Sequence, residues 1–261
     1  MIRWNIDPIM LDLGRLQLHW YGVLFGTSFL MGQWLTRKMC ELEGKSTRAI
    51  DQMLGYVVVG TLVGARVGHC LFYEPEVYLR DPLRILKIWE GGLASHGGGI
   101  GIFIMLWIFS RKHREFSYLW LLDHLCVGVA LAGVFIRTGN LFNSEIIGRP
   151  TDVPWAFVFE RVDALPRHPA QLYEAISYLF IFIFLWRWYK SPRQPARYPG
   201  RIFGLFLILV FGVRFLIEFI KENQVPFEAA LPINMGQILS IPMVAAGAWL
   251  YFVSARRAVR R

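Results

Sequence analysis

The chain has 261 residues, of which 55% are hydrophobic and 15% aromatic, and its formal net charge is +9. A positive surplus of this size can indicate nucleic-acid binding. Here, however, Lys and Arg lie in short stretches beside long apolar segments, and in a membrane protein that arrangement reflects topology. We therefore expect membrane lipids, and no nucleic acid, among the partners.

Seven apolar segments approach the roughly 20 residues that a helix needs to cross a hydrocarbon layer of about 30 Å. In chain order they cover residues 17–35, 53–73, 93–109, 118–136, 171–188, 202–219 and 235–253. The pattern predicts an all-α polytopic membrane protein with seven transmembrane helices. We expect one integral-membrane domain over residues 1–261, with a polar external loop region formed mainly by residues 137–170.

The distribution of Lys and Arg predicts the orientation of this domain. Alternate connections carry 16 such residues on one side and 10 on the other. The richer side includes residues 37–51, 110–117, 187–201 and the tail after residue 255. Because the richer side of a membrane protein is normally cytoplasmic, we expect an external N-terminus and a cytoplasmic C-terminus.

Small residues suggest a close helix contact. Gly60, Gly64 and Gly68 recur every four residues, which places them on one helix face where a second helix can approach closely. The cysteines Cys70 and Cys126 fall within apolar segments and are expected to be buried fillers. The three cysteines of the chain show no metal-ligand spacing, so we expect no metal.

Ionisable residues inside apolar segments are candidates for function, because their desolvation costs several kcal/mol unless a partner offsets it. Arg66 lies in the second segment, and Arg214 and Glu218 lie four residues apart in the sixth. The spacing allows Arg214 and Glu218 to pair along one helix. The alternative is that this ion pair is purely structural. Arg137, at the end of the fourth segment, also has a structural alternative, in which its long side chain places the guanidinium at the membrane–water interface.

His96 opens the third segment within the glycine-rich stretch GGLASHGGG at residues 91–99. Glycines permit close approach of a ligand to the backbone, and free N–H groups at a helix start favour anions. A histidine at this point can move a proton near neutral pH. The alternative is a core histidine with a structural role.

The stretch RTGNLFNSE at residues 137–145 places one guanidinium, two carboxamides and one carboxylate within nine residues. Arg is well matched to phosphate through its planar fork of donors, so the stretch suits a phospholipid headgroup. From the residues alone the chain is a membrane enzyme or a transporter with an anionic ligand. A transporter is disfavoured because the two halves of the chain show no repeat, and the last segment has no lysine for a retinal Schiff base.

The segment GVFIRTGNLFNSE, residues 133–145, resembles the signature of the prolipoprotein diacylglyceryl transferase family, with its core G-R-x-G-N-F-x-N-x-E. Further matches follow in order along nearly the whole chain: HWYG at 19–22, GLASHGG at 92–98, HPAQLYE at 168–174, RFLIEF at 214–219 and MGQILSIPM at 235–243. Ile136 and Leu141 depart mildly from the signature, and Val210 stands where many members have tyrosine.

The resemblance implies seven helices in a bacterial inner membrane, with a periplasmic N-terminus and loop region and a cytoplasmic C-terminus. The site that it implies is open to the outer leaflet and the periplasm. It also implies transfer of diacylglyceryl from phosphatidylglycerol to the lipobox cysteine of prolipoprotein signal peptides, with no cofactor. The essential residues implied are Arg137, Arg214 and His96.

The chemistry of such a transfer suggests a role for each polar residue. We expect His96 to be the base for the thiol, and Arg137 and Arg214 to stabilise the departing phosphate. The remaining candidates would bind the phosphatidylglycerol headgroup or hold an arginine: Asn140, Asn143, Glu145, Tyr21 and Glu218. Another enzyme acting on phospholipid headgroups would share most of these features.

Overall fold

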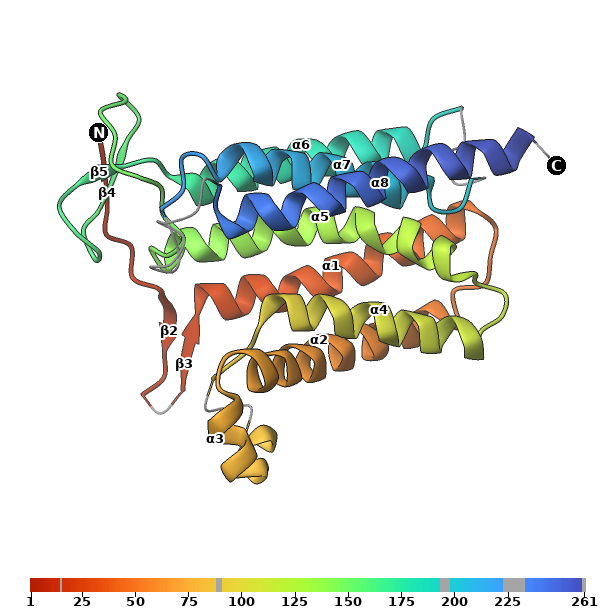
Figure 1. Cartoon of the computed structure of the whole chain (residues 1–261), viewed down its shortest axis with the longest axis horizontal. Helices are drawn as coiled ribbons and strands as arrows, with labels where there is room; N and C mark the ends of the chain where they lie inside the picture. Colours follow the sequence, from red (N-terminus) through yellow and green to blue (C-terminus); the bar gives the residue numbers. More distant parts are fainter. Residues whose placement is uncertain (15, 88–90, 193–197, 223–232, 260–261) are drawn as a thin grey trace. The chain divides into compact units, whose positions relative to one another are not determined.

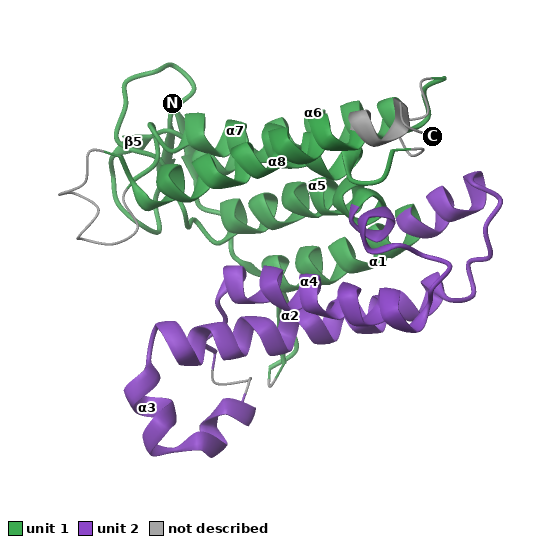
Figure 2. Ribbon diagram, turned by 45° about the vertical axis from the view of Figure 1, so that its right-hand side comes forward, with its two compact units in different colours: residues 1–35, 123–261 green, residues 36–122 purple. Residues whose placement is uncertain are grey.

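The computed structural model describes residues 1–261 except 15, 88–90, 193–197, 223–232 and 260–261, and it describes residues 255–259 by their backbone alone. Part of the basic tail and of the 187–201 connection, on which the predicted topology relies, therefore lies outside the described side chains. The chain forms two compact units, one of residues 1–35 and 123–261 and the other of residues 36–122. Figure 2 colours them separately, and each is described by itself.

Within the described residues, seven helices of 17 to 25 residues occupy the seven predicted segments. They are α1 (Trp20–Leu42), α2 (Ile50–Phe72), α4 (Ser95–Lys112), α5 (Tyr118–Phe142), α6 (Ala170–Tyr189), α7 (Arg201–Ile217) and α8 (Met235–Val259), shown in Figure 1. A mostly helical membrane protein is thus confirmed. By length and composition alone, three described helices could cross a membrane: α2, α5 and α8.

Two helix boundaries differ from the prediction in ways that affect the site. The helix α5 continues to Phe142, so Arg137 lies inside a helix and not in the following loop. Residues 17–19 form strand β3 (Gln17–His19), which pairs antiparallel with β2 (Ile9–Asp12), and α1 begins only at Trp20. Pairing in this hairpin uses the backbone groups that a longer helix would need.

A small sheet in the first unit was not predicted. Strand β1 (Ile2–Trp4) runs parallel to β4 (Phe157–Phe159), and β5 (Pro166–Arg167) lies antiparallel on the other side of β4. Beneath it Leu141 and Ile147 pack against both phenylalanines of β4, and the Trp4 indole donates to the Leu141 carbonyl at 2.9 Å. The N-terminus is thereby tied to the end of α5.

In the second unit, α2 and α4 pack along a glycine seam. A Cβ atom added to Gly60 would lie 2.7 Å from the Gly101 carbonyl oxygen, and one added to Gly68 would lie 2.8 Å from the Gly97 Cα. Gly64 faces the same two glycines of α4. The predicted close helix contact is confirmed, and two glycines of α4 contribute to it.

The connection from α2 to α4 contains α3 (Pro75–Arg80) and a short 3-10 helix, η1 (Pro82–Leu86). Arg66 holds this connection in place. Its side chain is buried and donates to the carbonyl oxygens of residues 84, 85, 87, 91 and 92. Arg66 therefore has a structural function, closing the loop that precedes α4.

In the first unit, α7 lies between α6 and α8, as Figure 1 shows. The backbones of α7 and α8 approach each other at Gly204 and Gly247, where a Cβ atom added to either glycine would clash with the backbone of the other helix. The start of α7 is fixed by Asp123 of α5, whose carboxylate accepts N–H groups from Gly200 and Phe203. Cys126 is a buried free cysteine in α5, as is Cys70 in α2, which confirms the prediction for both.

Candidate functional site

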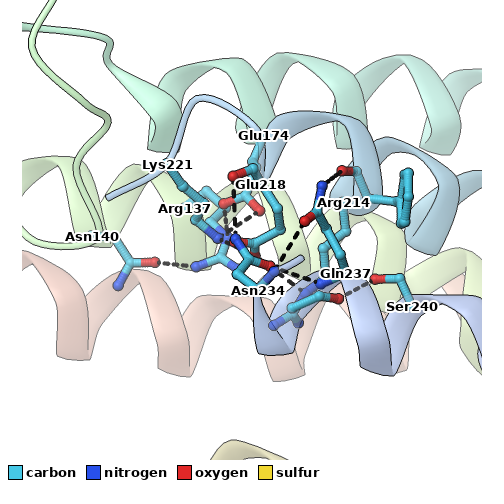
Figure 3. A network of polar contacts seen from close by, with 11 residues as sticks. Arg137, Asn140, Glu174, Arg214, Glu218, Lys221, Asn234, Gln237 and Ser240 are labelled. Atoms are coloured by element: carbon cyan, nitrogen blue, oxygen red, sulfur yellow. Dashed lines mark hydrogen bonds and ion pairs between the residues drawn. The ribbon is translucent and has the colours of Figure 1, made fainter. Parts of the chain in front are cut away.

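Five charged side chains of alternating sign form a mostly buried network in the first unit, drawn in Figure 3. The members come from three helices and from the residues directly after α7. In order along the network they are Arg137, Glu174, Lys221, Glu218 and Arg214. Three cations and two carboxylates leave these five groups with a net charge of +1.

The distances define one continuous chain of ion pairs. Arg137 Nε lies 2.7 Å from Glu174 Oε2, and Lys221 Nζ lies 3.4 Å from Glu174 Oε1. The same Lys221 Nζ lies 2.9 Å from Glu218 Oε1, which is 3.6 Å from Arg214 Nε. Glu174 is fully buried, whereas the Arg214 side chain is 35% exposed. The network therefore ends at a cation that an anionic ligand can reach.

Local sequence explains how Glu218 reaches its partners. An added Cβ on Gly236, at the start of α8, would overlap the Glu218 carboxylate, so a larger residue there would displace this carboxylate. Asn234 donates from Nδ2 to Glu218 Oε2 at 3.1 Å and to its carbonyl oxygen at 3.2 Å. Gln237 donates to the Phe215 carbonyl at 3.4 Å. The beginning of α8 thus holds the end of α7.

The end of α5 brings a second set of predicted residues together. Arg137 Nη1 donates to Asn140 Oδ1 at 3.0 Å, and Asn140 Nδ2 donates to Glu145 Oε1 at 2.8 Å. Asn143 Nδ2 donates to the same Glu145 oxygen at 3.2 Å. Arg137 therefore belongs to both sets, with its Nε toward Glu174 and its Nη1 toward the carboxamides.

The turn that returns Glu145 to Asn140 is strained. Ser144 and Ile146, which flank Glu145, have φ angles of 56° and 57°. The left-handed conformation costs an L-residue about 1–2 kcal/mol and is rare for a β-branched residue such as isoleucine. Such strain concentrates at functional sites, where surrounding contacts impose it. Gln171 supplies one of these contacts, donating to the Glu145 carbonyl at 2.8 Å.

Two glycines of the same segment make room for tyrosines. An added Cβ on Gly139 would lie 2.8 Å from the ring of Tyr21, and one on Gly133 would lie 2.7 Å from the ring of Tyr178. Tyr178 is hydrogen-bonded to Arg137. Tyr21 lies near enough to Glu145 and Arg137 for its hydroxyl to interact electrostatically with both side chains.

His96 lies in the second unit, in the first turn of α4, with an exposed side chain. Its Nε2 is 3.2 Å from the hydroxyl of Tyr73, whose ring stacks on it at 5.8 Å. The core-histidine interpretation is therefore wrong. The glycine density around His96 has a packing cause as well, because Gly97 lies in the seam with α2.

Comparison with known proteins identifies the family. The model of the family described as prolipoprotein diacylglyceryl transferase matches residues 8–253. A protein of Tolumonas auensis named phosphatidylglycerol–prolipoprotein diacylglyceryl transferase is 52% identical over 260 residues, covering all of both chains. Proteins of the same name from Chloroherpeton thalassium and Porphyromonas gingivalis are 48% and 46% identical, over 98% and 95% of this chain and 96% and 93% of theirs. The chain belongs to the prolipoprotein diacylglyceryl transferase family.

For this member of the family, the structure brings most of the predicted site residues together. One connected group contains Arg137, Asn140, Asn143, Glu145, Arg214 and Glu218, with Tyr21 beside it. The interfacial interpretation of Arg137 is wrong, because its side chain is only 15% exposed and is paired inside the protein. The predicted pair of Arg214 and Glu218 is present as an ion pair.

Two central residues of this candidate site, Glu174 and Lys221, were not predicted from the sequence. Glu174 lies in the first turns of α6 and Lys221 lies four residues after the end of α7. At such positions a charge is usually interfacial, so neither attracts notice. The signal that identifies Glu174 is its place within an apolar segment, the criterion that selected Arg66 and Arg214.

Proposed function

We propose that this chain transfers the diacylglyceryl group of phosphatidylglycerol to the lipobox cysteine of prolipoprotein signal peptides, forming a thioether and releasing glycerol phosphate. The names of the relatives support both substrates. The observation that carries the proposal is the network with a net charge of +1 that joins Arg137 to Arg214. It suits a phosphodiester, which is itself a monoanion.

The proposal includes placement in the inner membrane as one domain with seven spanning helices. The seven apolar segments support it, and so does the excess of Lys and Arg on one side of the predicted topology. In this orientation the N-terminus and the loop that contains β4 and β5 are periplasmic. The substrate-facing residues 137–145 and 214–221 would then lie toward the outer leaflet.

The reaction breaks one carbon–oxygen bond and forms one carbon–sulfur bond. The thiolate attacks the diacylglycerol carbon that carries the phosphate, and the electron pair of the broken bond stays on the phosphate oxygen. A monoanionic diester thereby becomes a monoester with more negative charge. Groups that bind the phosphate more tightly as this charge develops lower the barrier, and Arg137 and Arg214 are suited to this task.

The thiol must lose its proton, because a free cysteine with a pKa of about 8.5 is mostly protonated at neutral pH. His96 is our candidate base, with an exposed imidazole whose Nε2 lies 3.2 Å from the Tyr73 hydroxyl. That contact is suited to orienting the ring.

The remaining residues would recognise the glycerol headgroup. Glu145 is exposed and accepts hydrogen bonds from Asn140 and Asn143 through one carboxylate oxygen, Oε1. Its other oxygen can accept from glycerol hydroxyls. Tyr21 lies beside the same turn and can contact the headgroup. Recognition of both glycerol and phosphate would distinguish phosphatidylglycerol from other phospholipids.

The decisive experiment mixes purified protein in detergent with phosphatidylglycerol and a lipobox peptide, and follows the peptide by mass spectrometry. We expect a mass increase of one diacylglyceryl group, stable to hydroxylamine as a thioether is. The matched control is the same peptide with serine in place of the cysteine, which should remain unmodified. An unmodified cysteine peptide would contradict the proposal. Uptake of phospholipid into protein-containing vesicles without peptide modification would favour the transporter alternative.

A further inference from the structure

Both arginines of the site contact a carboxylate through the same atom. Arg137 Nε lies 2.7 Å from Glu174 and Arg214 Nε lies 3.6 Å from Glu218. A guanidinium is planar and presents its donors on separate edges. The ion pair therefore draws the Nε edge of each guanidinium toward a carboxylate, while the separate edge between the two Nη groups can bind another ligand. That edge is the one that binds phosphate through two parallel hydrogen bonds.

Lys221 connects the two carboxylates. Its Nζ lies 3.4 Å from Glu174 and 2.9 Å from Glu218, and both carboxylates and the lysine are buried. The lysine is also fixed through its backbone. Residue 221 forms a bridge with Gly148, and Arg149 Nε donates to the Lys221 carbonyl at 3.0 Å. The ammonium group therefore occupies a set position between the two acids.

The charge of Lys221 determines the charge of the whole network. Without it, the charges of the two arginines and two glutamates of the network would cancel. With it, the five groups carry +1 in an environment that excludes most water, where charges interact more strongly than in solvent. Lys221 itself is only 3% exposed, so its contribution reaches the ligand through the arginines.

We infer that Glu174 and Lys221 are positioning residues, which set the orientation of Arg137 and Arg214 toward the phosphate. The inference rests on the proposed function. Neither residue needs to touch the substrate. The alternative is that the pair only joins α6 to the end of α7.

A double variant, Glu174→Gln with Lys221→Met, distinguishes these possibilities. Glu174→Gln alone leaves the buried Arg137 without a carboxylate and Lys221 with only one, so it is expected to destabilise the fold. The double change removes one cation and one anion, keeps the net charge at +1, and leaves Glu218 paired with Arg214 and Asn234. Because the buried ammonium group is removed together with its carboxylate, the melting temperature of the double variant should lie closer to that of the wild type than that of Glu174→Gln alone does.

If the pair positions the arginines, the double variant should lose about 10- to 100-fold in kcat per folded molecule, since small misplacements at a reacting centre have effects of this size. The KM for phosphatidylglycerol should change much less, because the lost contacts strengthen mainly in the transition state. A double variant with wild-type kcat would overturn the inference. The inference would also be overturned if kcat and melting temperature fall together in the variants that lose Lys221 and are both kept in Lys221→Arg. That is the behaviour of a structural pair.

A second variant, Glu174→Asp, tests the inference even where the double variant does not fold. It keeps every charge and withdraws the carboxylate from Arg137 by about one carbon–carbon bond. We expect about a tenfold lower kcat with little change in melting temperature. Unchanged kcat would overturn the inference.

The matched control is Asp123→Asn, which alters a carboxylate just as deeply buried but at the opposite end of α7. It should lower the melting temperature and leave turnover per folded molecule unchanged. Wild-type protein is assayed in parallel. A wild type that transfers nothing would refute the proposed function, whereas an active wild type with fully active variants would refute only this inference.

Discussion

The carboxylate of Asp123 accepts the backbone N–H of Gly200 at 2.6 Å, although the two residues are 77 positions apart in the chain. Its other oxygen accepts the N–H of Phe203 at 2.7 Å. The first N–H groups of a helix have no partner within the helix. A side chain of α5 therefore caps α7, the helix that carries Arg214, and joins the two helices at the end opposite to the site.

Replacement of Asp123 should destabilise the protein without altering its chemistry. Asp123→Ala leaves two buried N–H groups unpaired, at about 1–3 kcal/mol each, so we expect a loss of about 2–6 kcal/mol. Asp123→Asn keeps one acceptor oxygen and should lose less, in the range of about 0.5–2 kcal/mol. Thermal unfolding in detergent would measure the stability of the wild type and of both variants, which should decrease in the order wild type, Asp123→Asn, Asp123→Ala. An alanine variant as stable as the wild type would contradict the capping role.

Arg137→Lys should lower transfer by about 100-fold or more, an effect typical of losing one aligned donor to a developing anion. An ammonium group keeps the charge but cannot hold Glu174 at 2.7 Å and Asn140 at 3.0 Å while presenting two parallel donors to phosphate. Arg214→Lys should behave similarly. The control is Arg37→Lys, at an exposed arginine paired with Glu41. Near-normal transfer by Arg137→Lys would mean that charge alone suffices.

His96→Gln should fold, bind phospholipid and lose transfer, because glutamine can hydrogen-bond to Tyr73 but cannot accept a proton. Tyr73→Phe removes only the 3.2 Å contact to Nε2 and should reduce transfer far less. Activity per folded molecule and lipid binding would be measured for both, together with His96→Ala. If His96→Gln stays active and only His96→Ala fails, the histidine positions a substrate and is not the base.

The loop between β4 and β5 should become less stable in acid. Hydrogen bonds from Arg167 lower the pKa of Asp163 below its ordinary value of 3.8. A carboxyl group with a lowered pKa stabilises the folded state above its ordinary value, and this stabilisation disappears as the pH falls through the lowered one. Hydrogen exchange of residues 157–167 should therefore differ between wild type and Asp163→Asn at pH 6, and the difference should disappear once the pH falls below the lowered pKa of Asp163. A difference that persists in acid would show that the charge is not responsible.

Reporter fusions would test the orientation. Fusions after Ser191 and after Arg261 should report cytoplasm, and one at Pro154 should report periplasm, because of the 16-to-10 split of Lys and Arg. Each fusion has its counterpart on the other side as a control. A periplasmic signal after Arg261 would require a different number of spanning helices or the opposite orientation.

Hydrophobic segments of about 20 residues located all seven long helices, because a run of that length needs no tertiary information to be recognised. The strands β1, β4 and β5 have only two or three residues and show no usable periodicity. Glu174 and Lys221 were missed for another reason. They lie 47 positions apart, and their pairing follows from how α6 packs against the end of α7, which one sequence does not display.

The seam between α2 and α4 has a genetic consequence. A clash with a side chain can be relieved by a second mutation that replaces that side chain with a smaller one. Gly236 is such a position, because the obstacle there is the Glu218 carboxylate. At Gly64 and Gly97 the obstacle is the backbone of the opposite helix, which every amino acid shares. Larger residues there should therefore have no suppressor at the point of contact, and revertants should restore the original glycine.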